Sequence, residues 1–169
     1  MIKLKLPLNT NELEKLNAGD EILLSGDIYT ARDAAHKRMI DKLPFDIKGQ
    51  VIYYVGPSST KPGEIYGSCG PTTSSRMDVY TPYLFDQGMI ACIGKGKRSK
   101  EVKQAIIRNK GIYFVTIGGL GALLQKCVKK VEDVAYEDLG TESIKKITVE
   151  DFPVYVGIDT KGNDIYEWY

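Results

Sequence analysis

The sequence predicts a mixed α/β domain in which sheets are layered with helices. Short apolar runs alternate with amphipathic segments through the middle of the chain, and further strand-like runs lie near both ends. A chain of 169 residues, 43% of them hydrophobic, is long enough to bury a core without disulfides or metals. We therefore expect one domain over residues 1–169.

The first third of the chain is expected to hold a strand between two helices. Asn-Thr-Asn-Glu at residues 9–12 is typical of a capping box, and it begins a short helix that Ala-Gly-Asp at residues 18–20 ends. Residues 21–28 have the composition of a strand. Thr30 is the expected cap of the second helix, which Pro44 closes.

The middle of the chain is expected to supply the central strands. Apolar runs at residues 51–55 and 89–93 are each stopped by glycine. Residues 99–109 have helical spacing, and a strand at residues 112–117 follows. Gly-Gly-Leu-Gly at residues 118–121 then turns into a further short helix.

The last third is expected to be mainly β-structure. Residues 127–136 and 143–149 have the pattern of strands. Residues 154–158 and 165–168 are expected to form a hairpin across the polar turn between them.

Charge and cysteine content exclude several classes of function. The 23 basic and 22 acidic residues leave a net charge of +1, so no overall field attracts nucleic acid or membranes. The first residues are too charged for a signal peptide and no apolar run approaches a membrane span, which predicts a cytoplasmic location. Cys69, Cys92 and Cys127 are widely spaced and odd in number, and they predict neither a disulfide framework nor a metal site.

The strongest signal for a functional site is Gly-Pro-Thr-Thr-Ser-Ser-Arg at residues 70–76. Pro71 suits the first position of a helix, which would place Thr72 and Thr73 at the positive end of the helix dipole. Arg76, one turn later, could join them in an anion-binding pocket. The alternative is a well-capped helix whose hydroxyls satisfy their own backbone, but capping needs one hydroxyl and four precede this arginine.

Three further basic positions are candidates for the same kind of site. Arg32 lies near the start of its expected helix, where the dipole disfavours a cation, so it indicates an anionic partner or a salt bridge to an acidic neighbour. His36 lies one turn further on the same face, either at a pocket or as a structural imidazole. Lys95 stands between two glycines after a strand, where α/β folds place ligand-binding loops. Lys97 and Arg98 are expected to form a solvated basic turn.

Four motifs together resemble the β component of class I fumarate hydratases and L(+)-tartrate dehydratases. They are Thr-Ala-Arg-Asp-Ala-Ala-His at residues 30–36, Gly-Pro-Thr-Thr-Ser-Ser-Arg-Met-Asp at 70–78, Ile-Gly-Lys-Gly at 93–96 and Ile-Gly-Gly at 117–119. The resemblance runs over nearly the whole chain, and the motif at 70–78 is the most specific. It implies a swivelling β/β/α domain that corresponds to a separate β subunit.

The resemblance implies that this chain carries only part of an active site. In the family the domain closes over a [4Fe-4S] cluster held by three cysteines of the α component, so this chain would provide no metal ligand. The cluster iron without a cysteine ligand binds the substrate hydroxyl and one carboxylate as a Lewis acid. The implied partners are therefore an α subunit, in a hetero-oligomer, and a C4 dicarboxylate, with neither nucleic acid nor a membrane.

The resemblance also implies roles for individual residues. Thr72 would be the general base that takes the proton from the carbon beside a carboxylate. Because a neutral threonine is a very weak base, surrounding cations and the helix dipole would have to activate it. The family's acid is an aspartate of the α component. The residues implied to bind carboxylates or line the pocket are Arg32, His36, Thr73, Arg76 and Lys95.

The implied function is the reversible dehydration of (S)-malate to fumarate by a hydro-lyase that is active only with its α subunit. Elimination of water builds negative charge on one carboxylate, and the cations of Arg32, Arg76 and Lys95 suit that charge. Two alternatives stay open. One is an L(+)-tartrate dehydratase β subunit, and the other is a non-catalytic anion-binding or regulatory module.

Overall fold

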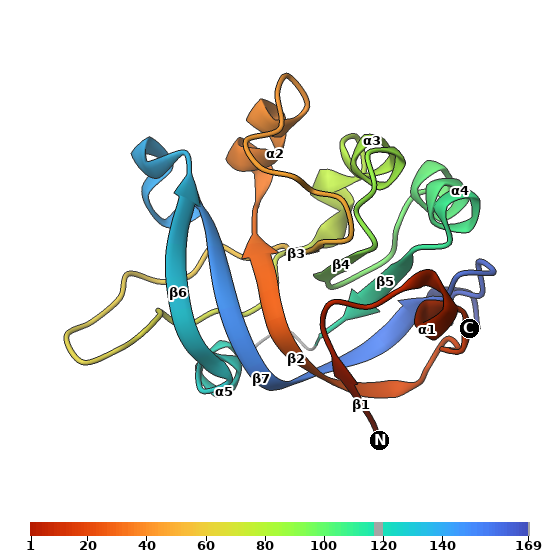
Figure 1. Ribbon diagram of the computed structural model, residues 1–169, viewed down its shortest axis with the longest axis horizontal. Coiled ribbons are helices and arrows are strands. Elements are labelled where there is room, and N and C mark those ends of the chain that lie inside the picture. The colour runs from red at the N-terminus through yellow and green to blue at the C-terminus, as the bar shows by residue number, and fades with distance from the viewer. Residues whose placement is uncertain (117–119, 169) are drawn as a thin grey trace.

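The strands form one sheet that closes on itself into a small barrel (Figure 1). The computed structural model describes residues 1–116 and 120–168. The strand order is β1-β2-β3-β4-β5-β7-β6, and an additional pairing of β2 with β7 closes the ring. The strands are β1 (Ile2–Lys5), β2 (Glu21–Thr30), β3 (Val51–Tyr53), β4 (Ala91–Gly94), β5 (Ile112–Val115), β6 (Val128–Ala135) and β7 (Ile144–Ile158).

The direction of the strands decides where a site can form. Strands β1 to β5 are all parallel, with register pairs such as Ile52 with Cys92 and Cys92 with Tyr113. Strand β7 runs antiparallel to β2, β5 and β6. The carboxyl ends of β2, β3, β4 and β5 therefore lie at one edge, and the segments that follow them meet there.

Short helices complete the fold, and α2, α3 and α4 lie side by side along the upper part of Figure 1. The expected cap at Asn9 is confirmed, because its side chain accepts a hydrogen bond from the amide of Glu12 at 2.9 Å. Ser99 caps α4 in the same way and accepts from the amide of Val102 at 3.2 Å. The α-helices are α1 (Thr10–Glu14), α2 (Asp33–Met39), α3 (Thr81–Asp86), α4 (Lys100–Asn109) and α5 (Gly121–Gln125). The 3-10 helices are η1 (Ser74–Met77), η2 (Glu137–Glu142) and η3 (Ile165–Glu167).

Two hydrophobic clusters hold the layers together. Side chains alternate across the strands, so that Tyr53 and Phe114 belong to one cluster while Ile52, Cys92 and Tyr113 belong to the other. The second cluster also contains the buried apolar side chains of α2, α3 and α4. The central strands are thus buried on both faces, as parallel strands usually are. The mixed α/β class predicted from the sequence is confirmed.

The expected C-terminal hairpin is wrong. Residues 144–149 and 154–158 are parts of one long strand, β7, and the expected second arm of the hairpin contains the 3-10 helix η3. Strand β7 stays continuous through a bend. At the bend, the register of β7 against β2 shifts between Leu24 and Gly26. Asp151 adopts a left-handed conformation there, with φ of 50°, and its amide donates to Ser25 Oγ at 3.0 Å.

The second helix begins later than expected. Thr30 ends β2, and its hydroxyl accepts a hydrogen bond from the amide of Lys145 at 3.1 Å. Arg32 is the residue that caps α2, and the helix ends at Met39, well before Pro44. The expected strand end at Ile117, the turn that contains Gly118-Gly119 and the Ile-Gly-Gly motif at 117–119 fall outside the described residues.

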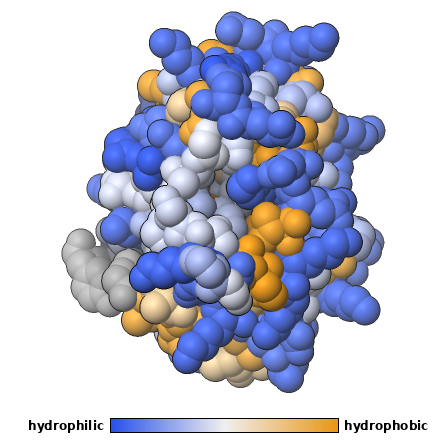
Figure 2. All heavy atoms as spheres, turned by 90° about the vertical axis from the view of Figure 1, so that its left-hand side faces the viewer, coloured by the Kyte–Doolittle hydropathy of each residue, from blue (hydrophilic) through white to orange (hydrophobic). Residues whose placement is uncertain are grey.

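The face shown in Figure 2 is mainly hydrophilic, and its described residues form no large hydrophobic patch. Hydrophilic residues cover most of that face, and the hydrophobic residues visible there form small separate areas. In residues 1–116 and 120–168, no helix is long and apolar enough to span a bilayer.

Candidate functional site

Segments that carry the candidate residues come together at the carboxyl edge of the parallel strands. Arg32 follows β2, Tyr54 follows β3, and Lys95 follows β4. Neighbouring strands bring these three segments side by side. Loops at this edge of a parallel sheet are where α/β proteins bind ligands.

The start of the threonine motif is extended and not helical. Pro71 forms an isolated antiparallel bridge with Val55, and the amide of Thr72 donates to the Tyr54 carbonyl at 2.8 Å. The expectation that Pro71 opens a helix is therefore wrong. The Tyr54 carbonyl, just after β3, gives the Thr72 amide the hydrogen-bond partner that a helix cap would otherwise have to provide.

The second half of the motif is paired with the chain after β4. Thr73 forms a parallel bridge with Lys95, and the amide of Ser74 donates to the Lys95 carbonyl at 2.9 Å. The helical part begins only at Ser74 and is the four-residue 3-10 helix η1. The predicted position of the two threonines at a helix N-terminus is therefore wrong. They lie in extended chain between the ends of strands, with Thr72 half-buried and Thr73 exposed.

Arg32 and Arg76 share one open pocket of about 440 Å³. Arg32 Nε lies 3.2 Å from Glu142 Oε1, and Arg76 Nη2 lies 2.9 Å from Asp33 Oδ1. All four side chains are partly exposed, so each ion pair contributes little to folding. The lining residues are Arg32, Asp33, Ala34, Lys37, Arg76, Tyr80 and Glu142.

Gly56 connects the pocket to the threonine segment. A Cβ atom at Gly56 would lie 2.4 Å from Arg32 Cζ, so the guanidinium packs directly on the glycine backbone. Gly56 follows Tyr54, whose carbonyl holds the amide of Thr72. The structure therefore brings Arg32, Arg76 and the segment that holds Thr72, Thr73 and Lys95 to one region, and leaves His36 inside the protein.

His36 is fully buried, which matches the alternative of a structural imidazole. Its Nδ1 donates to the Arg32 carbonyl at 2.9 Å, and its ring packs near Tyr54 and Tyr80. Burial lowers the pKa of His36 to about 4, and the charge of Arg98 acts in the same direction. The imidazole is thus neutral near pH 7, with Nε2 lacking a hydrogen-bond partner among the described residues.

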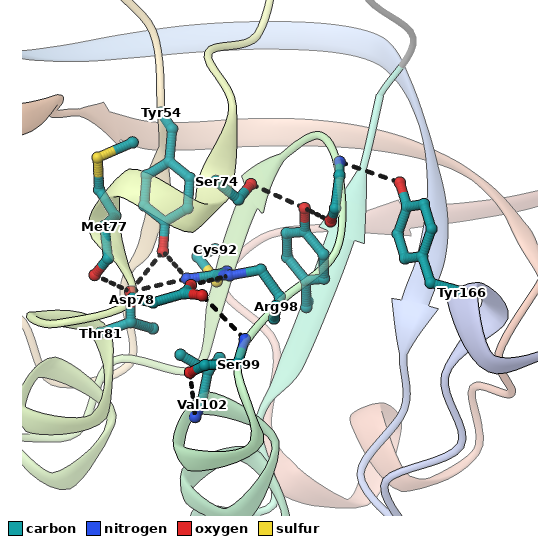
Figure 3. Close-up of polar contacts among 12 residues, drawn as sticks. Tyr54, Ser74, Met77, Asp78, Thr81, Cys92, Arg98, Ser99, Val102 and Tyr166 are labelled. Carbon is teal, nitrogen blue, oxygen red and sulfur yellow. Dashed lines mark hydrogen bonds and ion pairs between the residues drawn. The ribbon is translucent and has the colours of Figure 1, made fainter.

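Arg98 is the important residue that the sequence did not reveal. The expected solvated turn is correct for exposed Lys97 but wrong for Arg98, whose side chain is 0% exposed. Its Nε lies 2.7 Å from Asp78 Oδ1 (Figure 3). Nothing next to Arg98 in the sequence distinguishes it from Lys97. The available signal was Asp78, an acidic residue inside the most specific motif with no role assigned to it.

Cys69 and Cys127 do not suit an iron–sulfur cluster or another metal centre. In the parts of the chain that the structure describes, no group of three or more His, Cys, Asp or Glu side chains could hold a metal ion. Burial raises the pKa of the Cys69 thiol to about 12 and also raises the pKa of Cys127. Metal ligation needs the thiolate form, which burial disfavours here.

Comparison with known proteins identifies the family. The chain is 41% identical over 176 residues to fumarate hydratase 2 of Leishmania major and 42% identical over 164 residues to the anaerobic class I fumarate hydratase of Escherichia coli (strain K12). These matches cover 98% and 92% of this chain, but the chain spans only 31% and 30% of the relatives' length. A putative L(+)-tartrate dehydratase subunit β of Methanocaldococcus jannaschii is 38% identical over 172 residues, which cover 95% of this chain and 88% of that relative. The model of the fumarase C-terminus family matches residues 1–169, and the chain belongs to that family.

Proposed function

We propose that this chain is the β component of a [4Fe-4S]-dependent hydro-lyase that reversibly dehydrates (S)-malate to fumarate. The observation that carries the proposal is the shared pocket of Arg32 and Arg76 beside the segment with Thr72, Thr73 and Lys95. This arrangement occurs in a chain that matches the fumarase C-terminus family over residues 1–169. In this proposal, residues 1–169 form one domain of the enzyme. The proposal includes that this domain swivels to close over the active site.

The two arginines are assigned to the substrate carboxylates. A guanidinium can bind a carboxylate through two parallel hydrogen bonds, and a C4 dicarboxylate offers one carboxylate to each arginine. In the free chain, Glu142 and Asp33 occupy these positions as partly exposed carboxylates. Since such exposed pairs are weak, the substrate can replace them.

Lys95 supplies the third cation of the proposed site. It is half-buried beside Thr73, and within residues 1–116 and 120–168 it forms no ion pair. A cation fixed there would stabilise the charge that develops on a carboxylate as the neighbouring carbon loses its proton. Lys95 and Thr73 are therefore assigned to that carboxylate.

Thr72 is assigned the removal of the proton. Its amide is held by the Tyr54 carbonyl at 2.8 Å and its side chain is half-buried, so its position is set by the backbone after β3. A threonine hydroxyl is a very weak base, and nearby cations must favour its deprotonated form. The assignment thus depends on the same arginines and lysine that bind the substrate.

The cluster and the acid are assigned to a partner α subunit. The raised pKa values of the Cys69 and Cys127 thiols do not suit a cluster, which on the partner would act as a Lewis acid. A relative named as a putative L(+)-tartrate dehydratase subunit β is matched over 88% of its length, which supports the assignment of the rest of the site to a partner.

Anaerobic co-expression with a candidate iron–sulfur α partner tests the proposal. We expect the purified complex to interconvert (S)-malate and fumarate, and the chain alone to be folded but inactive. Robust turnover by the chain alone without iron would contradict the division of roles. A complex that turns over no C4 hydroxy-diacid would contradict the proposed function itself.

L(+)-tartrate dehydration is the second candidate activity. It is favoured by the match to the putative tartrate dehydratase subunit β, whose length is close to that of this chain. Tartrate carries a second hydroxyl, so a site built to bind that hydroxyl would disfavour malate. The ratio of kcat/KM for malate and tartrate, measured on the same complex, decides between them.

A further inference from the structure

We propose that Arg98 is the positioning residue of this site, because one buried guanidinium joins the three segments that carry Thr72, Arg76 and Lys95. The inference rests on the proposed function and adds a residue to it. Arg98 lies three residues after Lys95, its side chain is 0% exposed, and all of its side-chain partners except Cys92 come from other segments. Figure 3 shows these contacts.

The first connection leads to the segment with Arg76. Arg98 Nε donates to Asp78 Oδ1 at 2.7 Å, and the other oxygen of that carboxylate accepts from the Ser99 amide at 2.8 Å. Asp78 is the residue directly after η1, which contains Arg76. The ion pair therefore fixes the end of the short helix that presents Arg76 to the pocket.

The second connection leads to the segment with Thr72. Arg98 Nη2 donates to Tyr54 Oη at 3.1 Å and to Thr81 Oγ1 at 2.8 Å. The Thr81 hydroxyl donates to the Met77 carbonyl at 2.9 Å, so the Tyr54 hydroxyl donates to Thr81. Because the carbonyl of Tyr54 holds the amide of Thr72, a shift of Tyr54 would move the proposed base.

The third connection leads back to the loop with Lys95. The guanidinium lies over the ring of Tyr113, 4.6 Å from its centroid. The Tyr113 hydroxyl donates to the Gly96 carbonyl at 2.8 Å and accepts from Ser74 Oγ at 2.7 Å. The loop next to Lys95 and the start of η1 are thus held against the same side chain.

The chemistry of this cluster requires arginine. The remaining guanidinium nitrogen, Nη1, lies 3.3 Å from Cys92 Sγ, so every nitrogen of the group has a partner. A planar guanidinium directs its donors to several fixed positions, whereas a lysine ammonium is a single point on a flexible stem. Arg98→Lys keeps the charge but cannot make all of these bonds at once.

The activity test compares two variants of the α–β complex. Arg98→Lys is compared with a control variant, Leu13→Ala. The control truncates a fully buried side chain in α1 that is not among the side chains in contact with Arg98. Per folded complex, we expect kcat/KM for malate to fall about tenfold or more in Arg98→Lys and to stay within about twofold in Leu13→Ala. Equal kcat/KM for wild type and Arg98→Lys would overturn the inference.

Amide hydrogen exchange of the full chain gives a readout that does not depend on activity. In Arg98→Lys, the amides of Thr72 and Ser74 should exchange about tenfold faster relative to those of β2, with no such change in Leu13→Ala. An unchanged ratio in Arg98→Lys would overturn the inference. A wild-type complex without hydro-lyase activity would instead overturn the proposed function, whereas an active wild type with an equally active Arg98→Lys overturns the positioning role alone.

Discussion

The side chains of Arg76 and Arg98 differ strongly in solvent exposure, although each is paired with one carboxylate. Arg76 lies 2.9 Å from Asp33 with 51% of its side chain exposed, and Arg98 lies 2.7 Å from Asp78 with none exposed. Water can replace either partner of the exposed pair, but not of the buried one. The exposed pair can therefore open for a ligand, while the buried pair holds the surrounding chain in one arrangement.

Removing the buried cation should have the largest effect on folding. We expect Arg98→Met to lower the free energy of unfolding by about 3–5 kcal/mol, because the largely buried Asp78 carboxylate would lose its partner. Urea denaturation of the full chain measures this change. The double variant Arg98→Met with Asp78→Leu should recover part of the loss, and a loss below about 1 kcal/mol in the single variant would contradict the assigned difference between the two pairs.

The pH dependence of stability tests the buried region a second way. His36 takes up its proton near its ordinary pKa of 6.5 when unfolded but only near a pKa of about 4 when folded. The unfolded state therefore binds more protons below pH 6.5, and stability is lost as the pH falls from 6.5 towards 4. Asp33 opposes this shift, whereas Arg98 supports it.

We expect His36 to account for about 3 kcal/mol of the stability lost between pH 7 and pH 4. The free energy of unfolding is measured over this pH range for the wild type and for His36→Gln. Because the carboxylates titrate in both proteins, the difference between the two profiles reports the contribution of His36. Parallel pH profiles for the two proteins would show that His36 is not buried as the neutral form.

The exposed region should show the smallest effect on folding. Arg108 is a matched control for Arg76, because it lies 3.0 Å from Asp86 and is 52% exposed. Arg76→Gln and Arg108→Gln should each change the free energy of unfolding by less than about 1 kcal/mol. Thermal or urea unfolding measures both, and a much larger loss in Arg76→Gln would place Arg76 with Arg98 as a folding residue.

Local patterns predicted the parts of the fold that depend on local interactions. The cap at Asn9 and the helix that begins near Ser99 follow from residue type and spacing alone. The continuity of β7 did not, because its bend at Asp151 is stabilised by Ser25, which lies far away in the sequence. The extended conformation at Pro71 also depends on a distant partner, Val55.

The structure brings several of the candidate residues together, but not in the geometry that the sequence predicted. Arg32 and Arg76 do share a pocket, and Thr73 does lie beside Lys95. The burial of Arg98 could not be predicted, because it is decided by Tyr54 and Asp78, which are 44 and 20 residues away. A charged residue is normally exposed, and only such tertiary contacts overturn that expectation.

The central claim is that the exposed arginines bind a dicarboxylate, and the kinetics of one pair of variants test it directly. In a complex with the proposed α partner, Arg76→Gln should lower kcat/KM for malate by about 30-fold or more, equivalent to about 2 kcal/mol from a lost charged contact. Arg108→Gln, which removes an arginine of nearly equal exposure that is also paired with one carboxylate, should leave kcat/KM unchanged. Equal kcat/KM for Arg76→Gln and Arg108→Gln would contradict the account.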